Sequence, residues 1–178
     1  MKRMQYLGLA SVVWLTLSLI IMFLLWPPEM SKTLSQNAAR KRSSIIYYGI
    51  IFGVFLIPFT LYILCWLVPQ LGLGAAFIVV YLIGLLGQII ASIIPETTGI
   101  KVSVHRTAAF AMTLSLMVLT GLLALTPQIG GLDHWFSVLV FAWMAFSWVL
   151  FIFVIRTHKY SLVFQLLYSY LFLILVII

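Results

Sequence analysis

The chain has few of the residues from which most enzymes build their sites. Among 178 residues there are three acidic side chains, three histidines and one cysteine, and only 7% of the residues are charged. The lone Cys65 excludes an intrachain disulfide and a metal site made of several cysteines. Neither a serine-hydrolase elbow nor a nucleotide-binding loop occurs in the sequence. We therefore expect no metal and no cofactor in this protein.

Hydrophobic residues, by contrast, make up 65% of the chain, and the mean hydropathy is +1.23. Such a chain has too little polar surface to coat a water-soluble core. Six long apolar segments occupy most of it, each close to the roughly 20 residues that a helix needs to cross a bilayer. The segments cover roughly residues 6–26, 47–69, 73–94, 107–126, 134–155 and 160–178.

These segments predict an all-α fold, a polytopic transmembrane bundle of six helices with short loops. Hydrocarbon offers no partners to the backbone, so spanning segments satisfy their own hydrogen bonds as helices. The connections leave no room for a soluble domain, and we expect residues 1–178 to form a single domain. The first segment starts like a secretory signal, but its long apolar run and the lack of a small-residue cleavage pattern favour retention as a span.

Lysine and arginine are divided unequally between the two sides of such a bundle. Six spans place both termini on one side, with the connections 69–72 and 127–133, which contain neither residue. The pattern predicts basic loops in the cytoplasm and both termini outside, although the basic start of the chain favours the opposite orientation for the first span. The other side carries eight basic residues, Lys32, Arg40, Lys41, Arg42, Lys101, Arg106, Arg156 and Lys159.

The net charge of +7 is explained by this topology signal together with contact between basic residues and anionic lipid head groups. We expect membrane lipids as partners, and a second membrane protein or another copy of the chain as a further one. Nucleic acid is not expected, because no basic surface carries interleaved aromatic residues. The longest connection, residues 27–44, is consistent either with a short amphipathic surface helix or with an irregular loop.

Small residues at a spacing of four indicate where helices approach closely in a membrane. Such pairs occur in the second, third and fourth segments, which we therefore expect to form the tightest part of the bundle. The pairs are Gly49 with Gly53, Gly87 with Ala91, and Ala111 with Ser115.

The best candidates for a chemical site are Glu96 and His105. They flank a connection between the third and fourth segments, and a glycine turn at Gly99 would fold this connection back. Three interpretations are open: catalytic acid–base chemistry by a carboxylate-oriented imidazole, head-group binding, or a polar loop with a serine cap and an ion pair. The candidate ligand-binding residues are Lys101, Ser103, Arg106 and, within the third segment, Gln88.

This stretch resembles a family of six-helix membrane proteins known as domain-of-unknown-function family 998. The resemblance implies a six-helix membrane fold and a distant similarity to eukaryotic proteins that remodel the lipid of GPI anchors. The residues that carry it are Gly87, the Pro95–Glu96 turn, and His105 followed by Ala108 and Ala109.

Four functions are compatible with the sequence. The first is a membrane component that binds lipid or a protein partner and catalyses nothing. The second is a lipid-active enzyme that uses Glu96 and His105. The third is a small transporter or channel, for which Gln88 and Gln165 are the best polar candidates within the spans. The fourth, a b-type cytochrome, is disfavoured because His105 and His134 start neighbouring helices at opposite membrane faces.

Overall fold

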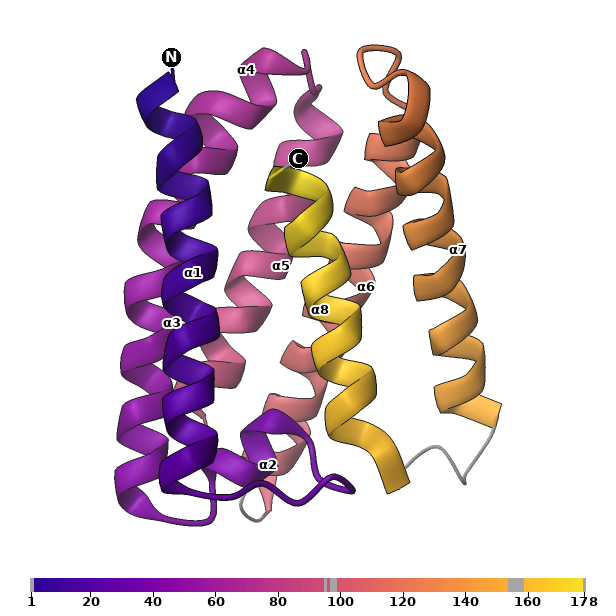
Figure 1. Ribbon diagram of the computed structural model, residues 1–178. Coiled ribbons are helices and arrows are strands. Elements are labelled where there is room, and N and C mark those ends of the chain that lie inside the picture. Colours follow the sequence, from indigo (N-terminus) through magenta and orange to yellow (C-terminus); the bar gives the residue numbers. More distant parts are fainter. Residues whose placement is uncertain (1, 95, 97–98, 154–158, 178) are drawn as a thin grey trace.

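The structure is a computed structural model that describes residues 2–94, 96, 99–153 and 159–177 (Figure 1). Within these ranges it is all-α, without a strand. The elements are α1 (Lys2–Leu25), α2 (Leu34–Ala38), α3 (Arg42–Tyr62), the π-helical turn η1 (Ile63–Leu67), α4 (Val68–Gln70), α5 (Ala75–Ile93), α6 (Ile100–Ala124), α7 (Gly131–Phe153) and α8 (Ser161–Ile177).

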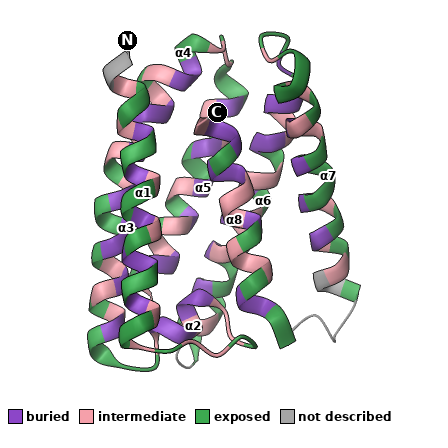
Figure 2. Cartoon of the chain, viewed as in Figure 1, coloured by how far each residue is buried: buried purple, intermediate pink, exposed green. Residues whose placement is uncertain are grey.

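Five of the helical segments are long and apolar enough to cross a membrane, which fits a multi-pass membrane protein. The first is α1, and the second is the continuous helical run from α3 to the end of α4. The other three are α5, α6 and α7. The sixth expected span appears as α8, an apolar helix of 17 residues that is shorter than the other five. Apolar side chains also cover the outside of the bundle, where Figure 2 shows exposed residues along every long helix.

The long helices run alternately up and down, so that both termini lie at one end of the bundle (Figure 1). The opposite end holds α2, the turn between α5 and α6, and the start of α8. We call this second end the basic end, because it carries Lys32, Arg40, Lys41, Arg42, Lys101, Arg106 and Lys159. Arg156, expected at the same end, and Pro95 lie outside the described residues.

Two helices begin at least five residues earlier than the apolar segments predicted. The second span starts at Arg42 and the fourth at Ile100, whereas the sequence indicated residues 47 and 107. Hydropathy marks the part of a helix that lies in hydrocarbon, but backbone hydrogen bonds continue the helix into the polar layer. The early start of α6 depends on Gly99, whose φ of 62° lies in the left-handed region that favours glycine. Lys101, Ser103, His105 and Arg106 therefore belong to a helix and not to a loop.

The π-helical turn η1 ends just before Pro69. Proline has no backbone N–H, and its ring would collide with the carbonyl four residues earlier in a regular α-helix. The wider turn removes this conflict, since the N–H of Val68 bonds to the carbonyl of Ile63, five residues back. The helix can therefore continue to Gln70 without a break in its course.

The predicted tight packing is confirmed for the third and fourth spans. Helices α5 and α6 share the most extensive contact in the bundle. A Cβ placed on Gly84 would lie 2.9 Å from the Cβ of Ser115, and one on Gly87 would lie 2.6 Å from the carbonyl oxygen of Ala108. Only glycine permits the two backbones to come this close.

The prediction is wrong for the second span. A Cβ on Gly49 or Gly53 would meet nothing within 4 Å, and Gly53 is exposed on the outer surface of α3. The main neighbour of this span is α1, where Gly8 lies against the ring of Tyr62. Spacing alone does not tell which side of a helix faces its neighbour, and here the GxxxG pair faces outward.

The two kinds of glycine give a matched test. Gly87→Ala forces a methyl group against the backbone of α6, and we expect it to destabilise the bundle by about 1–3 kcal/mol, the usual cost of overpacking. Gly53→Ala adds the same methyl group to open space and should leave stability unchanged or raise it by up to about 1 kcal/mol, because alanine has the higher helix propensity. Thermal unfolding of both variants in detergent, followed by circular dichroism, checks this. Equal melting temperatures would contradict the assignment of the α5–α6 contact.

Candidate functional site

The structure separates Glu96 from His105. The carboxylate of Glu96 accepts a hydrogen bond from Nε of Arg106 at 2.7 Å, and only 7% of the Glu96 side chain is exposed. Lys101, Ser103 and Arg106 point toward the outside of α6, whereas His105, one position before Arg106, is 3% exposed. Glu96 is thus paired with the guanidinium group of Arg106 and not with the imidazole of His105.

Both ring nitrogens of His105 are engaged. Nδ1 lies 2.7 Å from the carbonyl oxygen of Ile94 at the end of α5, and Nε2 lies 2.9 Å from Oγ of Ser35 in α2. A carbonyl oxygen can only accept, so Nδ1 must carry a proton. In the neutral ring Nε2 then accepts the hydroxyl proton of Ser35. His105 thus joins α5, α6 and α2, and its imidazole has no nitrogen left to bind a substrate.

Helix α2 and the residues just before it are also attached to α8. Its first turn is closed by a capping box, in which the backbone N–H of Gln36 bonds to Thr33 Oγ1 at 3.2 Å and the N–H of Thr33 bonds to Gln36 Oε1 at 3.0 Å. The N–H of Leu34 bonds to Oε1 of Gln165 in α8 at 2.7 Å. The backbone N–H of Leu162 also bonds to the carbonyl of Met30.

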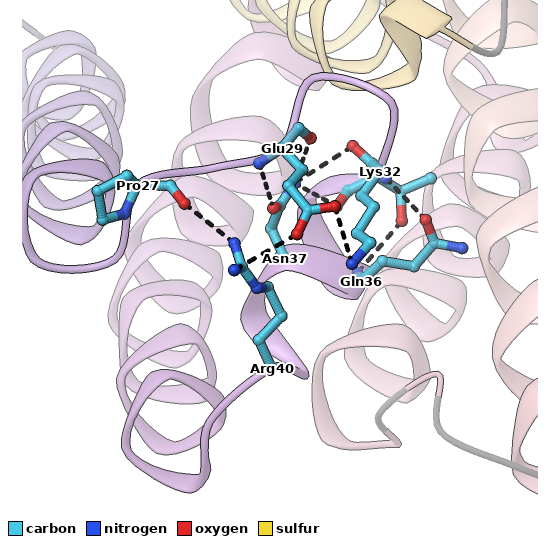
Figure 3. Close-up of polar contacts among 7 residues, drawn as sticks. Pro27, Glu29, Lys32, Gln36, Asn37 and Arg40 are labelled. Atoms are coloured by element: carbon cyan, nitrogen blue, oxygen red, sulfur yellow. Dashed lines mark hydrogen bonds and ion pairs between the residues drawn. The ribbon is translucent and has the colours of Figure 1, made fainter.

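The connection around α2 is organised by Asn37 (Figure 3). Its Nδ2 donates to the carbonyls of Glu29, Lys32 and Thr33 at 3.0–3.3 Å, and its Oδ1 accepts from the N–H of Glu29 at 2.8 Å. Asn37 is buried, as are Leu34 and Ala38. Of the two interpretations left open for residues 27–44, the short helix is correct. Its apolar side chains are buried under the end of the bundle.

Glu29 closes the outer side of the same connection. Its carboxylate forms ion pairs with Lys32 at 2.9 Å and Arg40 at 3.3 Å, and Arg40 also donates to the carbonyl of Pro27 at 3.1 Å (Figure 3). The hydrogen bond from Lys32, and after it the positive charges of Lys32 and Arg40, hold the pKa of Glu29 below its ordinary value. Glu29 therefore stays ionised and neutralises part of the basic end.

The remaining charges of the basic end are cationic and exposed. Lys41, Arg42 and Lys101 are exposed, and no acidic side chain in the described ranges pairs with them. Glu29 and Glu96 are the only acids at this end among the described residues, and both are already paired. The third acid, Asp133, lies in the first turn of α7 at the opposite end. The basic end therefore presents free positive charge to whatever surrounds it.

The last predicted residue, Gln88, lies inside the bundle. Its Nε2 donates to Oγ of Ser92 at 2.8 Å, one turn further along α5. Across the described ranges no three histidine, cysteine, aspartate or glutamate side chains are grouped as metal ligands would be. Sequence reasoning missed Ser35 and Asn37, and it named Gln165 only as a polar candidate for a transporter, without its bond to α2. The Thr33-Leu34-Ser35-Gln36 pattern of a capping box could have revealed α2, but nothing local indicates its contacts with α6 and α8.

Fold and site together define an all-α, multi-pass membrane protein that carries most of its charged residues at one end. No protein-family model matches the chain, and neither a curated protein nor a solved structure matches it. The resemblance to family 998 therefore stays a prediction.

The attachment of α2 can be tested by proteolysis, because trypsin cuts after Lys32, Arg40 and Lys41. Ser35→Ala leaves Nε2 of the buried His105 without a partner, at a cost of about 1–3 kcal/mol. We expect cleavage of this connection to be roughly tenfold faster, the effect of about 1.4 kcal/mol.

Ser31→Ala serves as the control for this experiment, since Ser31 is exposed and lies in the same connection. We expect the control to be cut at the wild-type rate. Gln165→Ala, which removes the bond from α8 to Leu34, should accelerate cleavage as Ser35→Ala does. An unchanged cleavage rate in both Ser35→Ala and Gln165→Ala would contradict the conclusion that these two bonds hold α2 in place.

Proposed function

We propose that the protein is a non-enzymatic, integral membrane component that binds anionic lipid head groups at its basic end. The observation that carries this proposal is the group of exposed, unpaired cations Lys41, Arg42 and Lys101. They belong to the starts of α3 and α6, next to the apolar length of each helix, where head groups lie. Near an anionic membrane surface each such residue contributes about 1 kcal/mol of attraction.

The contacts of Glu96 and His105 favour this function over lipid chemistry. General acid–base catalysis needs an imidazole within reach of a substrate proton. The imidazole of His105 is buried and bonded at both nitrogens, and the carboxylate of Glu96 is bonded to Arg106. These contacts support a positioning role for both residues. The side chain of Arg106, although bonded to Glu96, is 68% exposed and adds a positive charge to the proposed head-group surface.

Charge reversal tests the head-group proposal. The double variant Lys41→Glu/Arg42→Glu should lower the retention of phosphatidylglycerol during purification by at least about tenfold, because two attractive contacts become repulsive. Native mass spectrometry of protein extracted from vesicles with equal phosphatidylglycerol and phosphatidylcholine measures the retained lipid.

Lys2→Glu/Arg3→Glu is the charge-matched control, since it makes the same change at the opposite end of the bundle. We expect the control to keep its phosphatidylglycerol. If both double variants lost it equally, the binding would follow the net charge of the protein, and the proposed head-group surface would be wrong.

We also propose that α8 completes six crossings, with the basic end in the cytoplasm and both termini outside. The support is the charge asymmetry between the two ends of the bundle. Because Cys65 is the only cysteine, Cys65→Ala gives a cysteine-free chain in which single positions can be labelled. The exposed residues Ser43, at the basic end, and Gly130, at the other end, suit this purpose.

Labelling of these cysteines in intact cells with a membrane-impermeant maleimide measures which end of the bundle lies outside. We expect Gly130→Cys to be labelled at once and Ser43→Cys to be labelled only after permeabilisation. The reverse pattern would show that the basic start of the chain determines the orientation and not the basic loops. Labelling of both positions in intact cells would exclude a single orientation.

A further inference from the structure

A cavity of about 100 Å³ lies in the middle of the bundle. Its walls come from α1, α3, α5, α6 and α8, and Leu34 of α2 contributes at the basic end. The cavity lies on the inner side of the bundle, apart from the exposed cations of the proposed head-group surface. Its boundary is partly open and not fully enclosed.

The lining is apolar in its chemistry. Most of it is leucine and phenylalanine, such as Leu85, Leu116 and Phe55. Several polar residues in the wall are engaged with the protein: Gln88 bonds to Ser92, Gln165 bonds to the backbone of Leu34, and the hydroxyl of Tyr170 bonds to Thr16. An engineered cavity of about 150 Å³ with such a lining stays dry and takes benzene or xenon, whereas a water needs two to four polar partners.

The volume of the cavity and the medium around the bundle indicate which kind of molecule fits inside it. A volume of about 100 Å³ corresponds to three or four groups the size of a water molecule, each with a share of about 30 Å³. In a membrane-spanning bundle the medium outside the walls is hydrocarbon. The wall formed by α8 is the least extensively packed, since its contacts with α1 and α6 are small compared with those between α5 and α6.

We propose that this cavity binds the terminal segment of a hydrocarbon chain that belongs to a membrane phospholipid. The last few carbon groups of the chain occupy the space between Leu85, Leu116 and Phe172. The site goes beyond the head-group surface and does not require it, because the cavity wall makes no distinction between lipids with different head groups.

Photolabelling tests the proposal with the full chain in vesicles of phosphatidylcholine. The probe is phosphatidylcholine that carries a diazirine near the end of one acyl chain, and peptide mass spectrometry locates the adducts. We expect adducts on buried lining residues, among them Leu119 and Phe172, in addition to adducts on outward residues. Adducts confined to outward residues would overturn the proposal, and so would interior adducts formed by the free fatty acid but not by the phospholipid.

Neighbouring leucines on α5 provide a matched pair of variants. Leu85 lines the cavity and Leu86 is exposed on the outer surface. Leu85→Trp should fill the cavity and lower interior labelling several-fold, whereas Leu86→Trp should leave it unchanged. Leu116→Phe and its exposed counterpart Leu114→Phe repeat the comparison with a smaller change, in case Leu85→Trp does not fold.

Equal interior labelling in wild type and in a folded cavity-filling variant would overturn the proposal. Because the probe lipid is zwitterionic, failure of the head-group proposal leaves this experiment unaffected. Conversely, loss of interior labelling in Leu85→Trp with phosphatidylglycerol retained would separate the cavity from the basic end.

Discussion

In a bundle surrounded by lipid, a polar side chain has to find its partner within the protein, and these partnerships join the helices. Apolar contacts alone favour helix–helix association little, because lipid tails are as apolar as the side chains they would replace. Among buried side-chain polar atoms of the described residues, only Oγ of Ser147 has no partner. Bonds between helices include Thr60 with Tyr81, Tyr168 with the carbonyl of Thr113, Tyr170 with Thr16, and Tyr62 with the carbonyl of Val176.

This requirement explains how α8 is held although it packs less closely than α5 and α6. Its own hydroxyls from Tyr168 and Tyr170 reach α6 and α1, and Tyr62 from α3 reaches the backbone near its end. At the basic end Gln165 adds a bond to α2. Bonds of this kind fix the position of a helix without close backbone approach, so space remains beside it. The central cavity lies in that space.

The same physics decides how much of the structure could be predicted. Five of the six apolar segments correspond to span-length helices, because the length of an apolar run follows the thickness of the bilayer. The glycines of α5 were found by spacing, yet the same spacing failed for Gly49 and Gly53. A helix has two sides, and the sequence pattern does not say which one meets lipid.

The site was harder to predict, because its bonds connect residues distant in sequence. Glu96 and His105 were expected to lie together because a turn at Gly99 would fold their connection back. One of the two partners of His105, Ser35, lies 70 positions away, and the partner of Gln165 lies 131 positions away. No local pattern carries such information. The ion pair of Glu96 with Arg106, which is local, was within reach of sequence reasoning as one of the open interpretations.

Helix α2 connects the central cavity with the exposed cations of the basic end. Five residues are too few for a helix to be stable alone, since isolated helices shorter than about 12–15 residues are marginal in water. Its stability therefore comes from His105, Gln165 and the capping box. Leu34 faces the central cavity, and the residues that follow lead directly to the cations at the start of α3. A displacement of α2 would thus disturb the cavity wall and the position of these cations together, and His105 opposes such a displacement by holding α2 against α5 and α6.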